Sequence, residues 1–194
     1  MGLTVEKCLL AWTNSFRQMN AKADIVFFGD SLIFYGDFAS VFPDKVVCNL
    51  GLRGDTIKGL IDRVEQVQLL KPKRVFLMVG INDVAHITAD EFEVLYNKLL
   101  DTIKKVLPNA TLIVQNILPV NSKFFSISCD NTQIDAYNKR LLKIIEKRSL
   151  DFLDVYSLYV EDGQLPLLLT RDGIHLVTGA YGRWYEVLKE KYEN

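Results

Sequence analysis

Long apolar runs are missing from this 194-residue sequence, and so is an excess of charge of either sign. No stretch approaches the roughly 18 consecutive apolar residues that a transmembrane helix needs. The formal net charge is -1, so electrostatics gives no reason to expect a nucleic acid or an anionic membrane surface as a partner. We therefore predict no nucleic-acid binding and no membrane span, and expect a small molecule as the partner.

Cysteine is scarce, and a targeting segment is absent. The three cysteines, Cys8, Cys48 and Cys129, are odd in number and scattered, which fits reduced thiols better than a disulfide framework or a zinc site. The N-terminus has no basic segment followed by an apolar run, as a secretory signal would have. Glu6 stands where a myristoylation signal has Ser or Thr. These features predict a cytoplasmic protein.

Motifs that hold cofactors or metals are also missing. No G-x-G-x-x-G follows the first predicted strand, and no G-x-x-x-x-G-K cradle for phosphates occurs. No group of His and Cys has metal-ligand spacing. The G-x-S-x-G elbow is absent, because Ser31 is followed by Leu32 and Ile33. The sequence predicts chemistry that uses neither a cofactor nor a metal.

Short β-branched or aromatic runs alternate with longer amphipathic segments. The predicted strands lie at residues 25–28, 46–48, 75–79, 111–114 and 151–155. The predicted helices lie at residues 5–19, 57–67, 92–106 and 134–145 and from about residue 177. Wholly apolar strands separated by amphipathic helices favour a parallel sheet covered on both faces. With no repeat or linker, we predict one α/β domain over residues 1–194, a three-layer α/β/α sandwich with a mainly parallel five-stranded sheet.

Small and polar residues gather in four short groups. Three of them follow predicted strands, and the fourth precedes the last helix. The groups are Gly29-Asp30-Ser31, Asn49 to Thr56, Gly80-Ile81-Asn82-Asp83 and Asp172-Gly173-Ile174-His175. Ligands of open α/β sheets bind outside the carboxyl ends of the strands. We therefore expect these groups to meet at one edge of the sheet and to form the site.

Acyl transfer needs a hydroxyl that a neighbouring base can deprotonate, and His is the usual base. Ser31 follows the first strand, where a turn into a helix would expose its hydroxyl. The chain has only two histidines, His86 and His175. Asp172 precedes His175 by three residues, with Gly173 between them to ease a tight turn, so its carboxylate can reach the imidazole. This spacing predicts Ser31, His175 and Asp172 as a catalytic set.

The same chemistry needs hydrogen-bond donors for the oxyanion that forms on the substrate. The predicted donors are the backbone N–H groups of Ser31 and Gly54 and the side-chain amide of Asn82. Glycine at position 54 permits close approach of the backbone to a reacting carbonyl.

In this order, the four groups resemble the blocks of the SGNH/GDSL hydrolases: G-D-S, a Gly before D-T, G-x-N-D and D-x-x-H. The resemblance spans residues 29–175 and includes the Leu after the Ser. It implies a flavodoxin-like α/β/α fold, Ser31 as nucleophile, His175 as base with Asp172, and an oxyanion hole of Ser31, Gly54 and Asn82. The stretches NLGLRGDT and GIHLVTGAY also resemble the branch related to platelet-activating-factor acetylhydrolases.

Each of these residues also has a purely structural interpretation. Ser31 can cap a helix, His175 can begin one with Asp172 as its N-cap, and Asn82 can be a turn residue. His86 is expected on the surface or rim. A second set of residues, Asp30, Asp55 and Asp83, adjoins the predicted site, and we expect these carboxylates to hold loops by accepting backbone N–H bonds.

The sequence predicts a serine esterase that hydrolyses small acyl esters, above all acetyl esters, through an acyl-Ser31 intermediate. A carbohydrate or metabolite O-acetylesterase is the preferred form. The alternatives are a lysophospholipase or thioesterase for longer acyl chains and a non-catalytic binding protein on the same fold. The sequence leaves open a homo-oligomer and a lid formed by residues 120–131.

Overall fold

A five-stranded sheet forms the centre of the computed structural model, which describes residues 13, 15, 17, 20–124 and 129–193. The strands are β1 (Ile25–Gly29), β2 (Val47–Gly51), β3 (Arg74–Met78), β4 (Thr111–Gln115) and β5 (Asp151–Leu153). Their order is β2-β1-β3-β4-β5, and every neighbouring pair is parallel. The predicted α/β class and the parallel sheet are confirmed.

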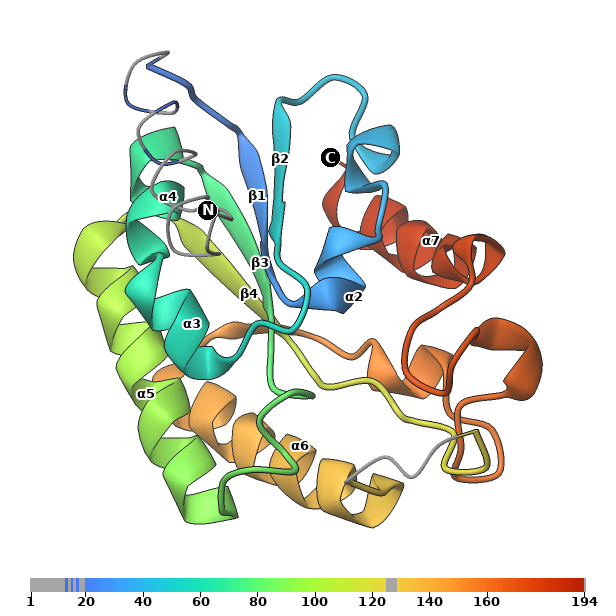
Figure 1. Ribbon diagram of the computed structural model, residues 1–194. Coiled ribbons are helices and arrows are strands. Elements are labelled where there is room, and N and C mark those ends of the chain that lie inside the picture. The colour runs from blue at the N-terminus through green and yellow to red at the C-terminus, as the bar shows by residue number, and fades with distance from the viewer. Residues whose placement is uncertain (1–12, 14, 16, 18–19, 125–128, 194) are drawn as a thin grey trace, which may run out of the picture.

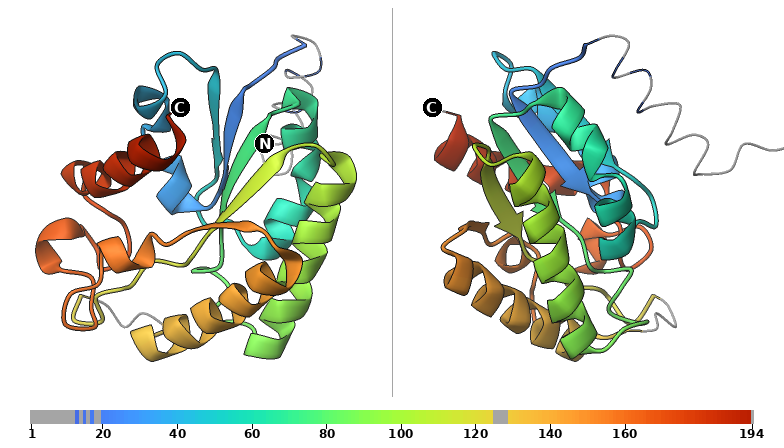
Figure 2. Two further views of the ribbon diagram at one scale, coloured as in Figure 1. Left: turned by 180° about the vertical axis from the view of Figure 1, so that it is seen from behind. Right: turned by 90° about the vertical axis from the view of Figure 1, so that its left-hand side faces the viewer.

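Helices cover both faces of this sheet (Figure 1). The helices are α2 (Ser31–Phe34), α3 (Ile57–Asp62), α4 (Val64–Leu70), α5 (Ala89–Val106), α6 (Asn131–Arg148) and α7 (Tyr181–Tyr192). Short 3-10 turns lie at Phe38–Val41, Tyr156–Leu158, Leu167–Leu169 and Thr178–Ala180. One face packs against α3 to α6 and the other against α2 and α7, so that α5 and α7 lie on opposite sides (Figure 2). This is the predicted three-layer sandwich.

Alternate residues of each strand point into two separate cores, as the pleat of a strand requires. Val26 and Phe28 face the core under α3 to α6, whereas Ile25 and Phe27 face the core under α2 and α7. In the second core the Phe27 ring stacks on Phe38 at 3.9 Å between centroids. Since both of their faces are buried, the central strands β1 and β3 are almost wholly apolar rather than alternating.

Local capping signals set the starts of the two long helices. Thr88 and Glu91 form a capping box at α5, and Asp130 and Gln133 form another at α6. Each box satisfies N–H groups that the first turn of a helix leaves without partners.

Several boundaries differ from those predicted. The helix predicted over 57–67 is broken at Arg63, whose φ of -120° ends α3 and precedes α4. β2 extends to Gly51, beyond the predicted residues 46–48, because its last residues pair with Phe27 to Gly29 of β1. β5 ends at Leu153 rather than at 155, and a 3-10 turn precedes the last helix.

Part of the predicted N-terminal helix lies outside the described residues. Only residues 13, 15 and 17 of the range 5–19 are described, and these three are helical. Cys8 and residues 125–128 of the 120–131 loop also lie outside. In the part of the chain that the structure describes, no helix is long and apolar enough to cross a membrane.

Candidate active site

Ser31 is the first residue of α2 and directly follows β1 through Asp30. The Asp30 carboxylate caps this short helix, because its Oδ1 accepts a hydrogen bond of 2.9 Å from the Leu32 N–H. Asp30 therefore does the capping that the structural interpretation assigned to Ser31. The Ser31 hydroxyl is left to make other contacts.

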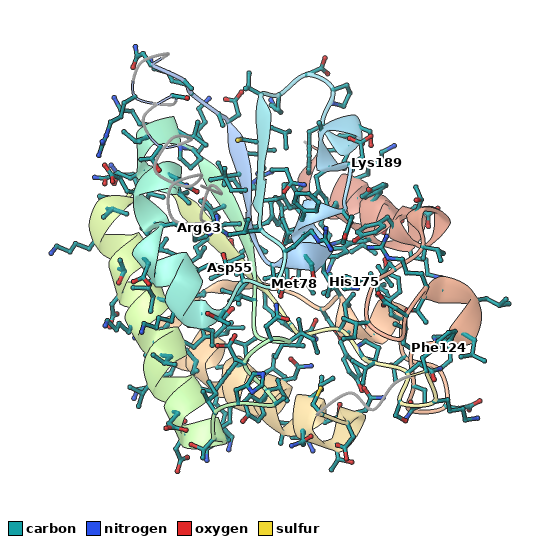
Figure 3. All side chains as sticks on the ribbon, in the orientation of Figure 1. Asp55, Arg63, Met78, Phe124, His175 and Lys189 are labelled. Carbon is teal, nitrogen blue, oxygen red and sulfur yellow. The ribbon has the colours of Figure 1, made fainter. Side chains whose placement is uncertain are left out.

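A continuous chain of hydrogen bonds joins Ser31, His175 and Asp172. Figure 3 labels His175, which lies beyond the carboxyl-terminal edge of the sheet. The Ser31 Oγ lies 2.8 Å from the Nε2 of His175. The Nδ1 of the same imidazole lies 2.6 Å from the Asp172 Oδ2. The structure thus brings Ser31 next to Asp172 and His175, which lie 141 and 144 positions further along the chain. In this geometry the imidazole can accept the Ser31 proton while the carboxylate holds the ring.

The turn that carries His175 is held by the other oxygen of Asp172. Its Oδ1 accepts N–H bonds from Ile174 at 3.1 Å and from His175 at 2.7 Å. Gly173 has a φ of +88°, a left-handed conformation that glycine adopts without strain. Partial burial raises the pKa of Asp172, but hydrogen bonds from the His175 backbone and ring outweigh it and hold this pKa below its usual value. The carboxylate is therefore ionised at neutral pH.

The predicted oxyanion donors lie on the loops after β1, β2 and β3. Within the described residues, neither the Ser31 nor the Gly54 N–H has a hydrogen-bond partner. Gly54 has a φ of +73°, and a Cβ added there would meet nothing within 4 Å, so its backbone is open to a ligand. The Asn82 Nδ2 donates to the Asp55 carbonyl at 2.8 Å. This bond orients the amide and leaves its second N–H available.

A cavity of about 350 Å³ adjoins these donors. Its lining consists of Gly54, Thr56, Ile81, Asn82, Ala85, His86, Cys129 and Ile174. His86 is exposed at its rim, as predicted. Cys129 and Ala85 were not predicted, because nothing in their neighbouring sequence marks them. A larger hollow of about 740 Å³ lies along α5, but residues of that helix alone line it and it holds none of the predicted site residues.

The carboxylates next to the site residues hold the loops, as predicted. Asp30, Asp55 and Asp83 accept backbone N–H bonds from Leu32, Thr56 and Ile57 at 2.9, 3.0 and 3.1 Å, respectively. All three side chains are buried. Burial raises the pKa of Asp30 to about 7 and that of Asp83 to about 6, since a buried carboxylate loses its hydration.

Sequence reasoning missed Arg63, the buried cation of this cluster. Its Nε donates to the Asp55 Oδ2 at 2.6 Å, and its Nη2 donates to the Gly29 carbonyl at 3.0 Å. The guanidinium also covers the Phe28 ring, with 4.5 Å between its Cζ and the centroid. Arg63 thus joins the end of β1 to the loop after β2. No motif marks Arg63, because a cation between apolar residues of a predicted helix is expected on the solvent-exposed face of that helix.

The described residues contain no group of three or more His, Cys, Asp or Glu side chains placed to hold a metal ion. That the reaction needs no metal ion stays a prediction.

Solved structures share this fold closely. A Streptococcus pneumonia protein described provisionally as a platelet activating factor superposes with a TM-score of 0.81 at 22% identity, covering 96% of this chain and 95% of that chain. A GDSL-like lipase from Bacteroides thetaiotaomicron VPI-5482 gives 0.75 at 19% identity, with 94% and 95% covered. A lipase/acylhydrolase from Enterococcus faecalis gives 0.71 at 22% identity, with 86% and 95% covered. At such identities the likeness shows the fold alone.

The sequence itself assigns the family. No curated protein matches the chain. The model of the GDSL-like Lipase/Acylhydrolase family matches residues 27–182, a range that includes all four motif groups. Since this match covers most of the 194 residues, the chain belongs to the GDSL-like lipase/acylhydrolase family.

Proposed function

We propose that the protein is a serine esterase that hydrolyses short acyl esters through an acyl-Ser31 intermediate. The observation that carries the proposal is the hydrogen-bonded chain from Asp172 through His175 to the Ser31 Oγ. A neutral imidazole with its Nδ1–H on a carboxylate presents a lone pair at Nε2, which is what a serine nucleophile needs.

In the acylation step, Ser31 Oγ attacks the ester carbonyl carbon and its proton passes to the Nε2 of His175. The negative charge that develops on the carbonyl oxygen is stabilised by the N–H groups of Ser31 and Gly54 and by the Asn82 amide. The imidazolium then gives its proton to the leaving alcohol as the ester C–O bond breaks. Water repeats the sequence on the acyl-enzyme and releases the acid and free Ser31.

The size of the neighbouring cavity favours a short acyl chain. At about 350 Å³ it lies near the lower end of the range for ligand pockets. The donors Gly54 and Asn82 line it together with Ile81 and Ile174, so an acyl group held at the donors enters this cavity. An acetyl group suits it better than the long chain of a lysophospholipid or a fatty thioester. We therefore propose acetyl esters of a carbohydrate or another metabolite as substrates.

The remaining expectations are part of the proposal. Cys48 and Cys129 form no disulfide, which supports a reducing, cytoplasmic location. The proposal also includes a single domain over residues 1–194 and a small molecule as the partner. Whether the protein forms a homo-oligomer stays open.

Initial rates on p-nitrophenyl esters from acetate to palmitate test the function. We expect the highest kcat/KM on acetate, a fall with chain length, and a loss of about 10⁴-fold or more in Ser31→Ala and His175→Ala. Ser40→Ala is the matched control, because it removes an exposed hydroxyl from the 3-10 turn at Phe38–Val41. A fluorophosphonate probe should label the wild type and Ser40→Ala but not Ser31→Ala.

Three results would overturn the proposal. Esterase activity retained in folded Ser31→Ala protein would reject the mechanism. Optimal rates at eight carbons or more would replace the short-chain esterase with the longer-chain alternative, and the absence of both turnover and labelling would favour a binding protein.

A further inference from the structure

Three side chains from two loops converge on the ring of Tyr35, which directly follows α2: Arg53 from the loop after β2, and Arg171 and His175 from the loop before α7. The His175 ring meets the Tyr35 ring edge-on, with centroids 5.5 Å apart. The Cζ of Arg171 lies 4.1 Å from the Tyr35 centroid, and the Cζ of Arg53 lies 5.9 Å from it. Two guanidinium groups therefore stand beside the imidazole that contacts Ser31.

The donors of these two guanidinium groups are unused within the described part of the chain. Arg171 comes closest to a carboxylate with its Nε 4.0 Å from the Asp172 Oδ2, which is too far for a hydrogen bond. Arg53 forms no ion pair with any described residue. The other arginines all donate to protein acceptors: Arg17, Arg63, Arg74, Arg140, Arg148 and Arg183. A cation over an aromatic face keeps its N–H groups, which lie in the guanidinium plane, available to a ligand.

The position of these cations assigns them to one part of the substrate. In the proposed reaction, His175 gives its proton to the oxygen of the leaving alcohol, so this alcohol must lie against the imidazole. Tyr35, Arg53 and Arg171 are on that side. The acyl group occupies the cavity at Gly54 and Asn82 instead.

The charge balance at this place favours an anion. Asp172, the carboxylate next to Arg171, already accepts hydrogen bonds from the Ile174 N–H and from the backbone and ring of His175. It carries one negative charge against two guanidinium charges. An anionic group on the alcohol would find unpaired donors in a fork geometry that matches phosphate and carboxylate, whereas a cationic group would be repelled.

Resting on the proposed function, we propose that Arg53 and Arg171 form an anion subsite for the leaving alcohol. The preferred substrates are then short acyl esters of alcohols that carry a phosphate or a carboxylate. Tyr35 holds the two guanidinium groups next to His175.

A matched series of acetyl esters tests the subsite: phenyl acetate, meta-acetoxybenzoate, meta-acetoxyphenyl phosphate and meta-acetoxyphenyl-trimethylammonium. In the wild type, we expect kcat/KM to be highest for the two anions and lowest for the cation, after division by each ester's rate of hydroxide hydrolysis. The larger of the two anionic values identifies phosphate or carboxylate as the better ligand. The preference should shrink in about 1 M salt, where the Debye length is only about 3 Å.

The variants Arg53→Gln and Arg171→Gln should each lower the ratio of anionic to neutral kcat/KM by about 5-fold, with a larger fall in the double variant. Arg53→Lys and Arg171→Lys, which keep the charge, should retain most of the ratio. Lys189→Gln is the control, because it removes one exposed positive charge from α7, away from His175 (Figure 3). It should leave the ratio unchanged.

The outcomes separate the subsite from the function on which it rests. Ser31-dependent hydrolysis of phenyl acetate without any preference for the anions would overturn the subsite and leave the esterase intact. Equal losses on all four esters in the arginine variants would also overturn it, because the arginines would then only position Tyr35 and His175. No Ser31-dependent hydrolysis of any ester would overturn the proposed function itself.

Discussion

Replacing Asp30 by Asn is expected to make the stability of the fold less sensitive to pH. The Asp30 carboxyl is 1% exposed, and burial raises its pKa to about 7. In the unfolded chain an Asp titrates near pH ~3.9. The folded state therefore binds more protons than the unfolded state between these values. The stability that the neutral carboxyl contributes is complete below the unfolded pKa and is lost as the pH rises through the folded pKa.

The magnitude follows from the shift. One group that is protonated only in the folded state changes the free energy of unfolding by about 1.4 kcal/mol per pH unit. Asp83 adds a similar slope only up to its pKa of about 6. Between about pH 6 and about pH 7, Asp30 alone accounts for the remaining fall in the free energy of unfolding. Replacing Asp30 should therefore reduce this fall by about 1 kcal/mol.

Urea unfolding of wild type, Asp30→Asn and Asp30→Ala at intervals between about pH 5 and about pH 8 measures this. Asn keeps an oxygen that can accept the Leu32 N–H, which the Asp30 Oδ1 accepts at 2.9 Å. Ala removes that acceptor and should cost a further ~1 kcal/mol at every pH. Both variants should flatten the slope, and only Ala should lower the stability at acid pH. If Asp30→Asn keeps the wild-type slope above pH 6, the buried carboxyl is not the group that titrates.

The remaining predictions concern the site and its buried cation. Asp172→Asn should lower kcat on p-nitrophenyl acetate by roughly 10⁴-fold, because the amide no longer holds the imidazole in the required tautomer; a loss below tenfold would contradict this role. Asn82→Ala should lower kcat by roughly 10²-fold with little change in KM, since the donor acts in the transition state, and a change confined to KM would argue against it. Arg63→Gln should lower the free energy of unfolding by about 3–5 kcal/mol, because Asp55 would lose the charge that compensates its burial. Urea unfolding checks this value, and a loss within 0.5 kcal/mol, about what a surface substitution costs, would refute it.

The layers of the fold were predictable because the central strands β1 and β3 are buried on both faces. A run such as Val75 to Met78 is apolar at every position, and a helix covers each side of it. The end of β2 was not predictable in this way, because Asn49 looks like a loop residue. Its Nδ2 donates to the carbonyls of Ile33 and Gly36, at 2.8 and 2.9 Å. These partners lie 16 and 13 positions away in the sequence, respectively. Their hydrogen bonds stabilise a polar residue within a strand, and no local sequence pattern predicts them.

The break between α3 and α4 has the same kind of cause. Apolar residues recur at helical spacing from Ile57 to Val67 without interruption, so the pattern predicts one helix. The break at Arg63 accompanies the burial of its guanidinium against Asp55 and Gly29. The Gly29 carbonyl is 34 positions away, outside the range of a local sequence pattern.

In the candidate site, too, local features were predictable from the sequence and long-range contacts were not. Asp172 and His175 were predictable because a local turn brings residues three positions apart together. Ser31 was predictable because it follows the end of a strand, although its side chain is buried rather than exposed as expected. Arg171 was not predictable, since it contacts Tyr35, a residue far away in the sequence. Arg53 lies closer to Tyr35 in the sequence, but no motif marks this contact either.

Each predicted oxyanion donor is the chain neighbour of a buried carboxylate: Ser31 of Asp30, Gly54 of Asp55 and Asn82 of Asp83. Donors stabilise an oxyanion only if they need no reorganisation during the reaction, and these carboxylates fix the three loops through their backbone N–H groups. Arg63 is the cation of the cluster and pairs with Asp55 alone. Asp30 and Asp83 have no such partner among the described residues, but their raised pKa values allow each carboxyl to be neutralised by a proton instead of by a cation. The motif groups therefore specify loop support as well as chemistry, and that support weakens as Asp30 and Asp83 ionise.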